Sequence, residues 1–433
     1  MLLRFSVANF LSFYDKVTFD MFPNQNRDRF PKHIYRQHVP LLKESAIYGP
    51  NGSGKSNFIQ AVNFFRNFLF KKDFLRQIDI SRLKYRLVQT NSHPINMEME
   101  FEVSGKYYLY QISIDSDVKE ELYLSGIGER EDKLLFKREG DKIVSDLIEN
   151  QVSTDHLLRM NPSSSTLSLN NEFPIFNSID VSNAYSWIKD YLIVVEVTSK
   201  IPVLIHMMSQ LPELRNFANE ILKGSDLNIH DFRVQEWSFD EWLEKHRDYQ
   251  IKEFVEKNLS SIDSGLEFAY DNRNDFNVYV DVKGNKKVQE FAFSQYGVNG
   301  FKLDMDIHSQ SDGTVRMLIL IPAIYDALYN NKTVFIDEIE NSIHPNLIRS
   351  IIEYYSSHQS NGQLIYTTHL SKLMDQQRLL RLDEYWITFK EDGQTRMRPL
   401  SEYAIQDTIK IENGYLQGRY GGIPNINIMD GDA

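Results

Sequence analysis

The chain has 433 residues, of which 42% are hydrophobic and 25% are charged, and it contains no cysteine. This composition is typical of a globular protein with one large domain or two closely joined ones, and the lack of cysteine excludes disulfides, zinc–thiolate sites and cysteine nucleophiles. The net charge of -12 disfavours general attraction to a phosphate backbone, so any contact with nucleic acid has to be a local patch.

The N-terminal segment lacks the features of a signal peptide. It is apolar up to Phe13, but Arg4, Ser6 and Asn9 interrupt it, which favours a strand. The longest apolar run, residues 317–324, is far shorter than the roughly 20 residues that span a bilayer. We therefore expect a cytoplasmic protein without a membrane segment, which also suits the absence of cysteine.

The first third of the chain contains strand and helix signals in turn. Residues 1–20 have the alternation of a hairpin, and residues 44–48 form a short apolar strand that leads into a glycine-rich turn. A helix is predicted over 53–70 from its stripe of apolar side chains. Residues 95–136 repeat a period of two, which predicts an antiparallel sheet.

The middle of the chain turns helical. Residues 211–222 have helical spacing with Gly224 just beyond, and Ser238 and Glu241 form a capping box that opens a charged helix toward Leu259. Aromatic residues here, such as Trp242, are interpreted as core packing, with a partner platform as the alternative.

The last part returns to an α/β pattern. Residues 276–282 and 288–293 predict a hairpin around Gly284. Further strands are predicted at 334–336, 364–366 and 385–389, with a helix after Pro345.

The strongest motif lies between the strand at 44–48 and the helix that follows it. Residues Gly49 to Ser56 read Gly-Pro-Asn-Gly-Ser-Gly-Lys-Ser and fit the P-loop pattern in full. In such a loop, backbone N–H groups cradle phosphates, the lysine neutralises their charge and the serine hydroxyl ligates Mg²⁺. The alternative is a glycine-rich turn with a chance Lys-Ser. The predicted nucleotide-binding residues are Gly49, Asn51, Gly52, Ser53, Gly54, Lys55 and Ser56.

Two carboxylates follow the apolar strand at 334–336. Asp337 and Glu338 stand at the strand end where ligands bind in open α/β sheets. Asp337 is the expected Mg²⁺ partner through water, together with Ser56. Glu338 is placed to polarise the water that attacks the γ-phosphate of ATP. Lys55 and Glu338 are thus candidate catalytic residues.

The length of chain between the two motifs restricts the class of P-loop protein to which the sequence can belong. Far more chain separates Lys55 from Asp337 than the few βα units of an ordinary P-loop core. A large insertion is therefore expected. Hexameric motors and RecA-like cores rarely have such an insertion, whereas heads of the SMC and Rad50 kind are built around one.

Three further segments resemble the motifs of ATP-binding-cassette (ABC) ATPases. Ser311-Asp-Gly313-Thr314 before a helix is similar to the degenerate signature motif. Residues 341–345, Asn-Ser-Ile-His-Pro, resemble the D-loop, and Thr367-Thr368-His369 after a strand resembles the switch histidine. Ser311 and Gly313 would then contact a nucleotide phosphate, and His369 would be a third catalytic residue that contacts the γ-phosphate or the attacking water. A local turn and a core or surface histidine are the alternatives.

The resemblance covers most of the chain and implies a fold, a cofactor and partners. The chain looks like an SMC- or Rad50-like head and is similar to the ATPases of bacterial abortive-infection and anti-phage operons, such as those of the PARIS, Septu and OLD-like systems. ATP and Mg²⁺ would be the cofactors. The signature of one protomer would close over ATP held by another, which implies an ATP-sandwiched homodimer or a higher homo-oligomer.

The implied function is a nucleotide-controlled switch or scaffold for a partner effector in anti-phage defence. The chain shows no nuclease metal cluster, so the effector, expected to be a nuclease, would be encoded separately. The alternative is a Rad50- or RecF-like DNA-repair head that binds DNA directly, for which the basic segment 27–38 is the candidate patch. A transporter subunit is a third alternative, which the long insert and the degenerate signature disfavour.

The expected fold is an α/β head of the ABC type, with a P-loop core, an antiparallel β subdomain and an inserted, mainly helical subdomain. We predict an N-terminal ATPase lobe at 1–145, the helical insert at 146–265 and a C-terminal ATPase lobe at 266–433.

Overall fold

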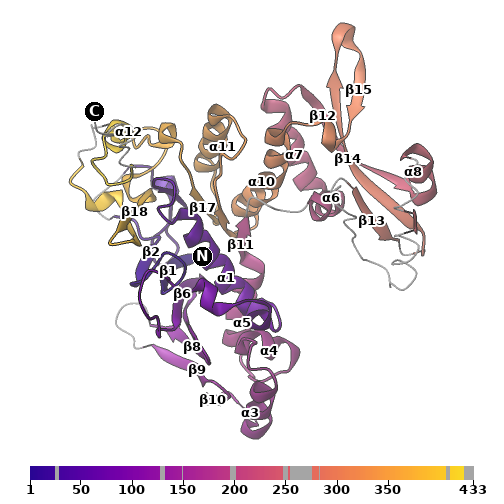
Figure 1. Cartoon of the computed structure of the whole chain (residues 1–433). Coiled ribbons are helices and arrows are strands. Elements are labelled where there is room, and N and C mark those ends of the chain that lie inside the picture. The colour runs from indigo at the N-terminus through magenta and orange to yellow at the C-terminus, as the bar shows by residue number, and fades with distance from the viewer. Residues whose placement is uncertain are drawn as a thin grey trace. The chain divides into compact units, whose positions relative to one another are not determined.

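The protein divides into two units in a computed structural model (Figure 1). The structure describes residues 1–24, 29–126, 132–148, 150–195, 201–246, 252–253, 276–281, 283–405 and 410–423. The first unit comprises Met1–Val195, Asp326–Glu340 and Arg349–Ala433, and the second comprises Glu196–Tyr325 and Asn341–Ile348. The segment 146–265, predicted as one insert, thus contributes to both units. Within the described ranges, no helix is both long and apolar enough to cross a membrane.

An antiparallel sheet in the first unit has the strand order β10-β9-β8-β7-β6-β1-β2. Its strands are β1 (Leu2–Ala8), β2 (Val17–Asp20), β6 (Ile95–Val103), β7 (Lys106–Ile114), β8 (Val118–Ser125), β9 (Lys133–Glu139) and β10 (Lys142–Val144). Burial alternates along β6 and β7, as expected for a sheet with one face on the core. The predicted hairpin at 1–20 and antiparallel sheet at 95–136 are confirmed.

A second sheet of this unit has the order β11-β16-β17-β5-β18-β19. Its strands are β5 (Glu44–Tyr48), β11 (Leu192–Val195), β16 (Thr333–Ile336), β17 (Gln363–Thr367), β18 (Tyr385–Glu391) and β19 (Gln394–Pro399). Neighbouring strands are parallel except β18 and β19. Strands β5, β16 and β17 are buried along their whole length, as is usual when both faces of a parallel sheet are covered. The predicted α/β class is confirmed.

Helix α1 (Lys55–Phe70) connects the cores of the two sheets (Figure 1). The Phe58 ring lies 5.8 Å from that of Phe5 on β1 and 6.3 Å from that of Phe335 on β16, measured between ring centroids. The predicted helix at 53–70 is confirmed, with its first turn beginning at Lys55 because Gly54 has φ of 111°. The helix that follows the P-loop is therefore held by both sheets.

The other elements of the first unit surround these sheets. They are β3 (Ile34–Tyr35), β4 (Leu41–Leu42), α2 (Ile80–Leu83), α3 (Gln151–Met160), α4 (Thr166–Glu172), α5 (Ile179–Ser186) and α12 (Ile411–Leu416). Helices α10 (Asp312–Tyr329) and α11 (Pro345–Ser357) each have residues in both units.

The second unit contains a sheet of the order β12-β14-β13, with β15 paired to β14. Its elements are α6 (Ile201–Gln210), α7 (Pro212–Gly224), β12 (Ile229–Ser238), α8 (Phe239–His246), β13 (Phe276–Val280), β14 (Lys286–Tyr296) and β15 (Lys302–Met305). The predicted hairpin around Gly284 is confirmed by the pairing of β13 with β14.

Helix α8 begins at the predicted capping box. The Ser238 backbone N–H donates to Glu241 Oε2 at 3.0 Å, and the Glu241 N–H donates to Ser238 Oγ at 3.3 Å. Trp242 is buried against Phe276, so its interpretation as core packing is confirmed. The predicted extension of this helix toward Leu259 lies outside the described residues beyond His246, apart from Lys252 and Glu253.

Candidate functional site

Three predicted motifs meet at one edge of the parallel sheet. Strand β17 lies between β16 and β5 and is parallel to both, with Ile336 opposite Tyr366 and Thr367 opposite Ile47. The loops that follow these strands therefore leave from the same edge, which is where α/β sheets bind ligands. They carry Asp337 and Glu338 after β16, His369 after β17 and the P-loop after β5.

The P-loop backbone requires glycine at positions 49 and 54. Gly49 and Gly54 have φ of 157° and 111°, and a Cβ on either residue would lie 2.1 Å from Thr388 Oγ1 or 2.2 Å from Thr395 Oγ1. These threonines lie on β18 and β19, and Thr395 Oγ1 donates to the Ser53 carbonyl at 2.7 Å. The loop is thus shaped by a hairpin from the far end of the chain.

Lys55 is buried at the start of α1. Its ammonium donates to the carbonyls of Gly49 at 2.8 Å and Pro50 at 3.2 Å. Burial lowers the pKa of Lys55 to about 8, and the nearby carboxylates of Glu338, Glu340 and Asp337 oppose that shift. The lysine is therefore mainly protonated at pH 7 and carries the positive charge that phosphates require.

Ser56 and Asp337 lie close enough to share a metal ion. The Ser56 hydroxyl donates to Asp337 Oδ1 at 3.3 Å, and the Thr367 hydroxyl donates to the same oxygen at 2.7 Å. Mg²⁺ prefers oxygen ligands and is commonly held by one or two carboxylates together with substrate phosphates. The donor set of Ser56 and Asp337 beside the P-loop fits Mg²⁺ and a nucleotide.

Glu338 adopts an unusual backbone conformation. Its φ of 47° lies in the left-handed region, which residues other than glycine rarely occupy outside turns and functional sites. Its backbone N–H donates to Thr367 Oγ1 at 2.7 Å. The conformation turns the chain sharply just after Asp337, so two consecutive carboxylates are presented at the same sheet edge.

His369 is held in the loop after β17. Its backbone N–H donates to Glu340 Oε1 at 2.5 Å. Burial, and next the positive charge of Lys55, lower the pKa of His369, while Glu340, Glu338 and Asp337 oppose that shift. The imidazole is therefore neutral at pH 7 and can accept or donate a hydrogen bond.

The structure places the other two predicted motifs in the second unit. Ser311 Oγ accepts a hydrogen bond from the Thr314 N–H at 3.2 Å at the start of α10. A Cβ on Gly313 would lie 2.6 Å from the carbonyl oxygen of Ser342, which belongs to the predicted D-loop. The two predicted motifs thus pack together, which explains the small residue at position 313.

Sequence reasoning gave no role to three residues of this site. Thr388 and Thr395 support the P-loop from strands that no motif marks, so no sequence signal points to them. Glu340 could have been noticed, because it is a third carboxylate two residues beyond Glu338 in the same turn. Thr367 was recognised only as part of the switch-histidine segment.

The basic segment 27–38 is less basic on the surface than its sequence indicates. Arg27 lies outside the described residues, and His33 is buried, with Nδ1 3.0 Å from Glu384 Oε1. Arg29, Lys32 and Arg36 are exposed. The candidate DNA patch therefore consists of these three side chains.

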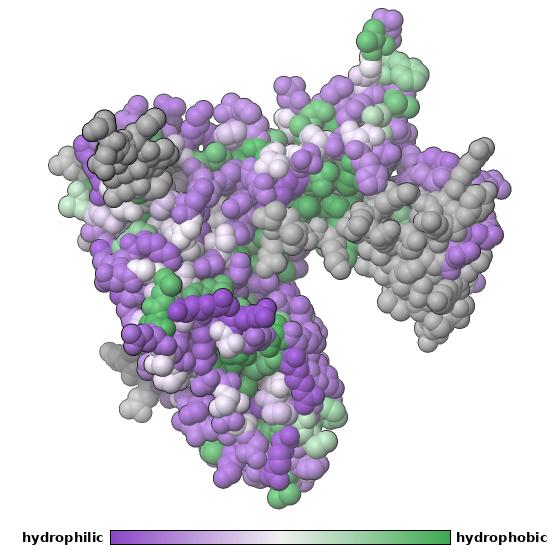
Figure 2. Space-filling model, in the orientation of Figure 1, coloured by the Kyte–Doolittle hydropathy of each residue, from purple (hydrophilic) through white to green (hydrophobic). Residues whose placement is uncertain are grey.

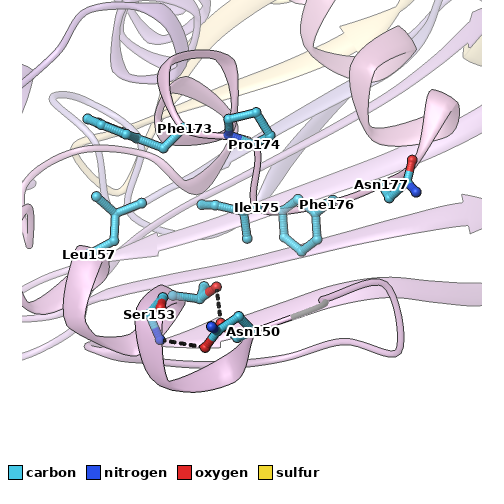
Figure 3. Close-up of a pocket in the computed structure, with 9 residues that line it drawn as sticks. Asn150, Ser153, Leu157, Phe173, Pro174, Ile175, Phe176 and Asn177 are labelled. Atoms are coloured by element: carbon cyan, nitrogen blue, oxygen red, sulfur yellow. Dashed lines mark hydrogen bonds between the residues drawn. The ribbon is translucent and has the colours of Figure 1, made fainter.

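A hollow of about 460 Å³ lies elsewhere in the first unit, between α3 and residues 173–177 (Figure 3). Its lining includes Leu157, Phe173, Ile175 and Phe176, and the polar groups come from residues such as Asn150, whose side chain caps α3. None of its lining residues is charged. It therefore offers no charged group to balance the charge of a phosphate or a metal ion.

A family model described as "AAA domain, putative AbiEii toxin, Type IV TA system" matches residues 45–375. Similar solved structures include an SMC head bound to the C-winged helix domain of ScpA, which is 13% identical in sequence; the match has a TM-score of 0.49 and covers 93% of this chain and 99% of that one. They also include the SMC head domain from Thermotoga maritima, which is 13% identical; the match has a TM-score of 0.41 and covers 92% of this chain and 98% of that one. No curated protein matches.

The lowered pKa of Lys55 predicts a pH dependence of ATP binding. Phosphates favour the protonated ammonium, and above pH 8 the fraction of free protein with this charge falls about tenfold per pH unit. The dissociation constant for ATP, measured by calorimetry, should therefore rise by about twofold from pH 7 to 8 and more steeply toward pH 9.5. In Lys55→Arg the guanidinium stays charged, so the constant should not change over this range. Equal wild-type affinity at pH 7 and 9.5 would contradict the assignment.

Proposed function

The chain belongs to the family described as "AAA domain, putative AbiEii toxin, Type IV TA system", and on that premise we propose that it binds and hydrolyses ATP as an ABC-type ATPase. The observation that carries the proposal is the hydrogen-bonded junction of Ser56, Asp337 and Thr367 beside the P-loop. It joins a phosphate-binding loop to two carboxylates at one sheet edge, which is the arrangement that phosphoryl transfer needs.

Each side chain of the site has a proposed task. Lys55 and the N–H groups of the P-loop bind the phosphates, and Ser56 and Asp337 hold Mg²⁺. Glu338 orients the attacking water and accepts its proton. His369, neutral at pH 7, hydrogen-bonds the γ-phosphate or this water. When bound, Mg²⁺ neutralises charge on the β- and γ-phosphates.

We also propose that ATP brings two copies together. Ser311 and Gly313 form a compact turn at the start of α10, with the Ser311 hydroxyl at the helix start. Such a turn can approach a phosphate held by another copy, since the helix N-terminus provides N–H donors. The dimer would thus depend on nucleotide, and hydrolysis at Glu338 would release it.

The biological role we propose is control of a separate effector, expected to be a nuclease, in anti-phage defence. The support is the resemblance of the motifs and an exposed apolar surface on the β14–β15 hairpin. There Val298 is 85% exposed and Phe301 66% exposed, and Figure 2 shows hydrophobic residues at this position. Exposed apolar groups of this kind often mark protein contacts. The hairpin is therefore the proposed contact for a partner protein.

The ATPase proposal predicts distinct effects of two substitutions. Lys55→Ala should abolish ATP binding, because it removes the charge that faces the phosphates. Glu338→Gln should keep ATP affinity within about threefold and lower turnover by a factor of about 100 or more, since an amide cannot accept the proton. Steady-state phosphate release and equilibrium binding measure these effects.

Glu172→Gln is the matched control, because this carboxylate pairs with Lys72 on the surface and should not affect turnover. Normal turnover in Glu338→Gln would remove Glu338 from its role. A wild-type protein that neither binds nor hydrolyses ATP would refute the proposed function.

The dimer proposal predicts a change in mass. Glu338→Gln with Mg-ATP should double its mass in light scattering, because the ATP-bound state persists. The double variants Glu338→Gln/Lys55→Ala and Glu338→Gln/Ser311→Arg should keep the mass seen without nucleotide, since one lacks ATP and the other lacks the signature hydroxyl. A constant mass in Glu338→Gln would contradict closure in trans by Ser311.

A further inference from the structure

Thr367 occupies the centre of the candidate site. It is the last residue of β17, and its side chain is fully buried. Its hydroxyl donates to Asp337 Oδ1 at 2.7 Å and accepts the backbone N–H of Glu338 at 2.7 Å. A single oxygen atom thus bridges the metal-binding carboxylate and the backbone of the proposed base.

The two hydrogen bonds use the hydroxyl in complementary ways. A threonine hydroxyl has one hydrogen to donate, which goes to Asp337, and lone pairs to accept, one of which takes the Glu338 N–H. No apolar side chain of the same shape can do either. Asp337 Oδ1 also accepts from Ser56, so the hydroxyls of Ser56 and Thr367 together orient this carboxylate oxygen.

The Glu338 backbone depends on this support. Its φ of 47° is sparsely populated for a residue with a side chain, and such conformations persist where surrounding contacts enforce them. The hydrogen bond from its N–H to Thr367 holds the turn at the residue whose carboxylate must be aimed. Loss of that bond would let Glu338 relax away from its position.

The surrounding chain has other anchors that do not involve the hydroxyl. The Ile339 N–H donates to the Thr367 carbonyl at 3.1 Å, and the His369 N–H donates to Glu340. Strand β17 remains paired to β16 and β5 through its backbone. The fold at this edge of the sheet therefore does not depend on the Thr367 side chain, whereas the orientation of Asp337 and Glu338 does.

We propose that Thr367 is a positioning residue for ATP hydrolysis, which sets Asp337 and Glu338 relative to each other through its hydroxyl. The inference rests on the proposed ATPase function. It assigns Thr367 no contact with substrate. It requires a hydroxyl at this position, so serine can replace threonine and valine cannot.

The test compares Thr367→Val and Thr367→Ser with Thr333→Val. Thr333 is also buried in this sheet, at the start of β16, and its hydroxyl donates to Gln363 Oε1 at 2.9 Å, so its substitution removes a buried hydroxyl far from the strand end. Thr367→Ala is measured as well, so that a valine variant that does not fold leaves the test intact. The readouts are kcat, the KM for ATP, the Mg²⁺ concentration for half-maximal rate and the melting temperature.

We expect Thr367→Val and Thr367→Ala to lower kcat about 10- to 100-fold, as for loss of a buried hydrogen bond to a charged group. The KM for ATP should change less than threefold, because the P-loop is untouched, and more Mg²⁺ should be needed because Asp337 is less well oriented. Thr367→Ser should keep kcat within about threefold of wild type, and Thr333→Val should have normal kinetics.

Two results would overturn the inference. One is a kcat within threefold of wild type in the valine and alanine variants. The other is an equal loss of kcat in Thr333→Val or Thr367→Ser, which would show a general packing effect. Both are distinct from failure of the proposed function, in which the wild-type protein itself hydrolyses no ATP.

Discussion

The parallel pairing of β5, β17 and β16 is the constraint on which the rest of the site depends. Because these strands are neighbours in this order, three loops from distant parts of the sequence leave from one sheet edge. The buried hydroxyl of Thr367, at the end of the central strand β17, is then hydrogen-bonded to Asp337 and to the backbone of Glu338 in the loop after β16. The chemistry of the site follows from this alignment, since neither carboxylate has a defined relation to the P-loop without it.

The rigidity of the P-loop comes from two directions. Helix α1 anchors the C-terminal end of the loop, because Phe58 on this helix packs against aromatic rings from both sheets. The full burial of Phe58 contributes about 1.5–3 kcal/mol to stability. Thr395 on β19 fixes the loop itself, because its hydroxyl donates a hydrogen bond to the Ser53 carbonyl. A loop fixed in this way presents its N–H groups without reorganisation, which is how preorganised donors stabilise developing charge.

Much of this arrangement could be predicted from the sequence. The P-loop pattern, the strand before Asp337 and the hairpins all have local signals, because each depends on periodicity or glycine within a short window. The supporting contacts of Thr388 and Thr395 have no such signal, since they depend on the pairing of distant strands. The boundary at Val195 between the two units was also not visible, because no linker composition marks it. The burial of His33 reduced the predicted basic patch, since a histidine beside a buried glutamate looks the same in sequence as one in solvent.

Hydrogen–deuterium exchange of the whole chain, with and without a non-hydrolysable ATP analogue and Mg²⁺, tests the central claim most directly. The account predicts that protection on binding is concentrated in peptides covering 49–60, 336–341 and 366–370, the three loops at one sheet edge. Protection confined to other segments, or absent from these three at saturating nucleotide, would contradict the assignment of the site.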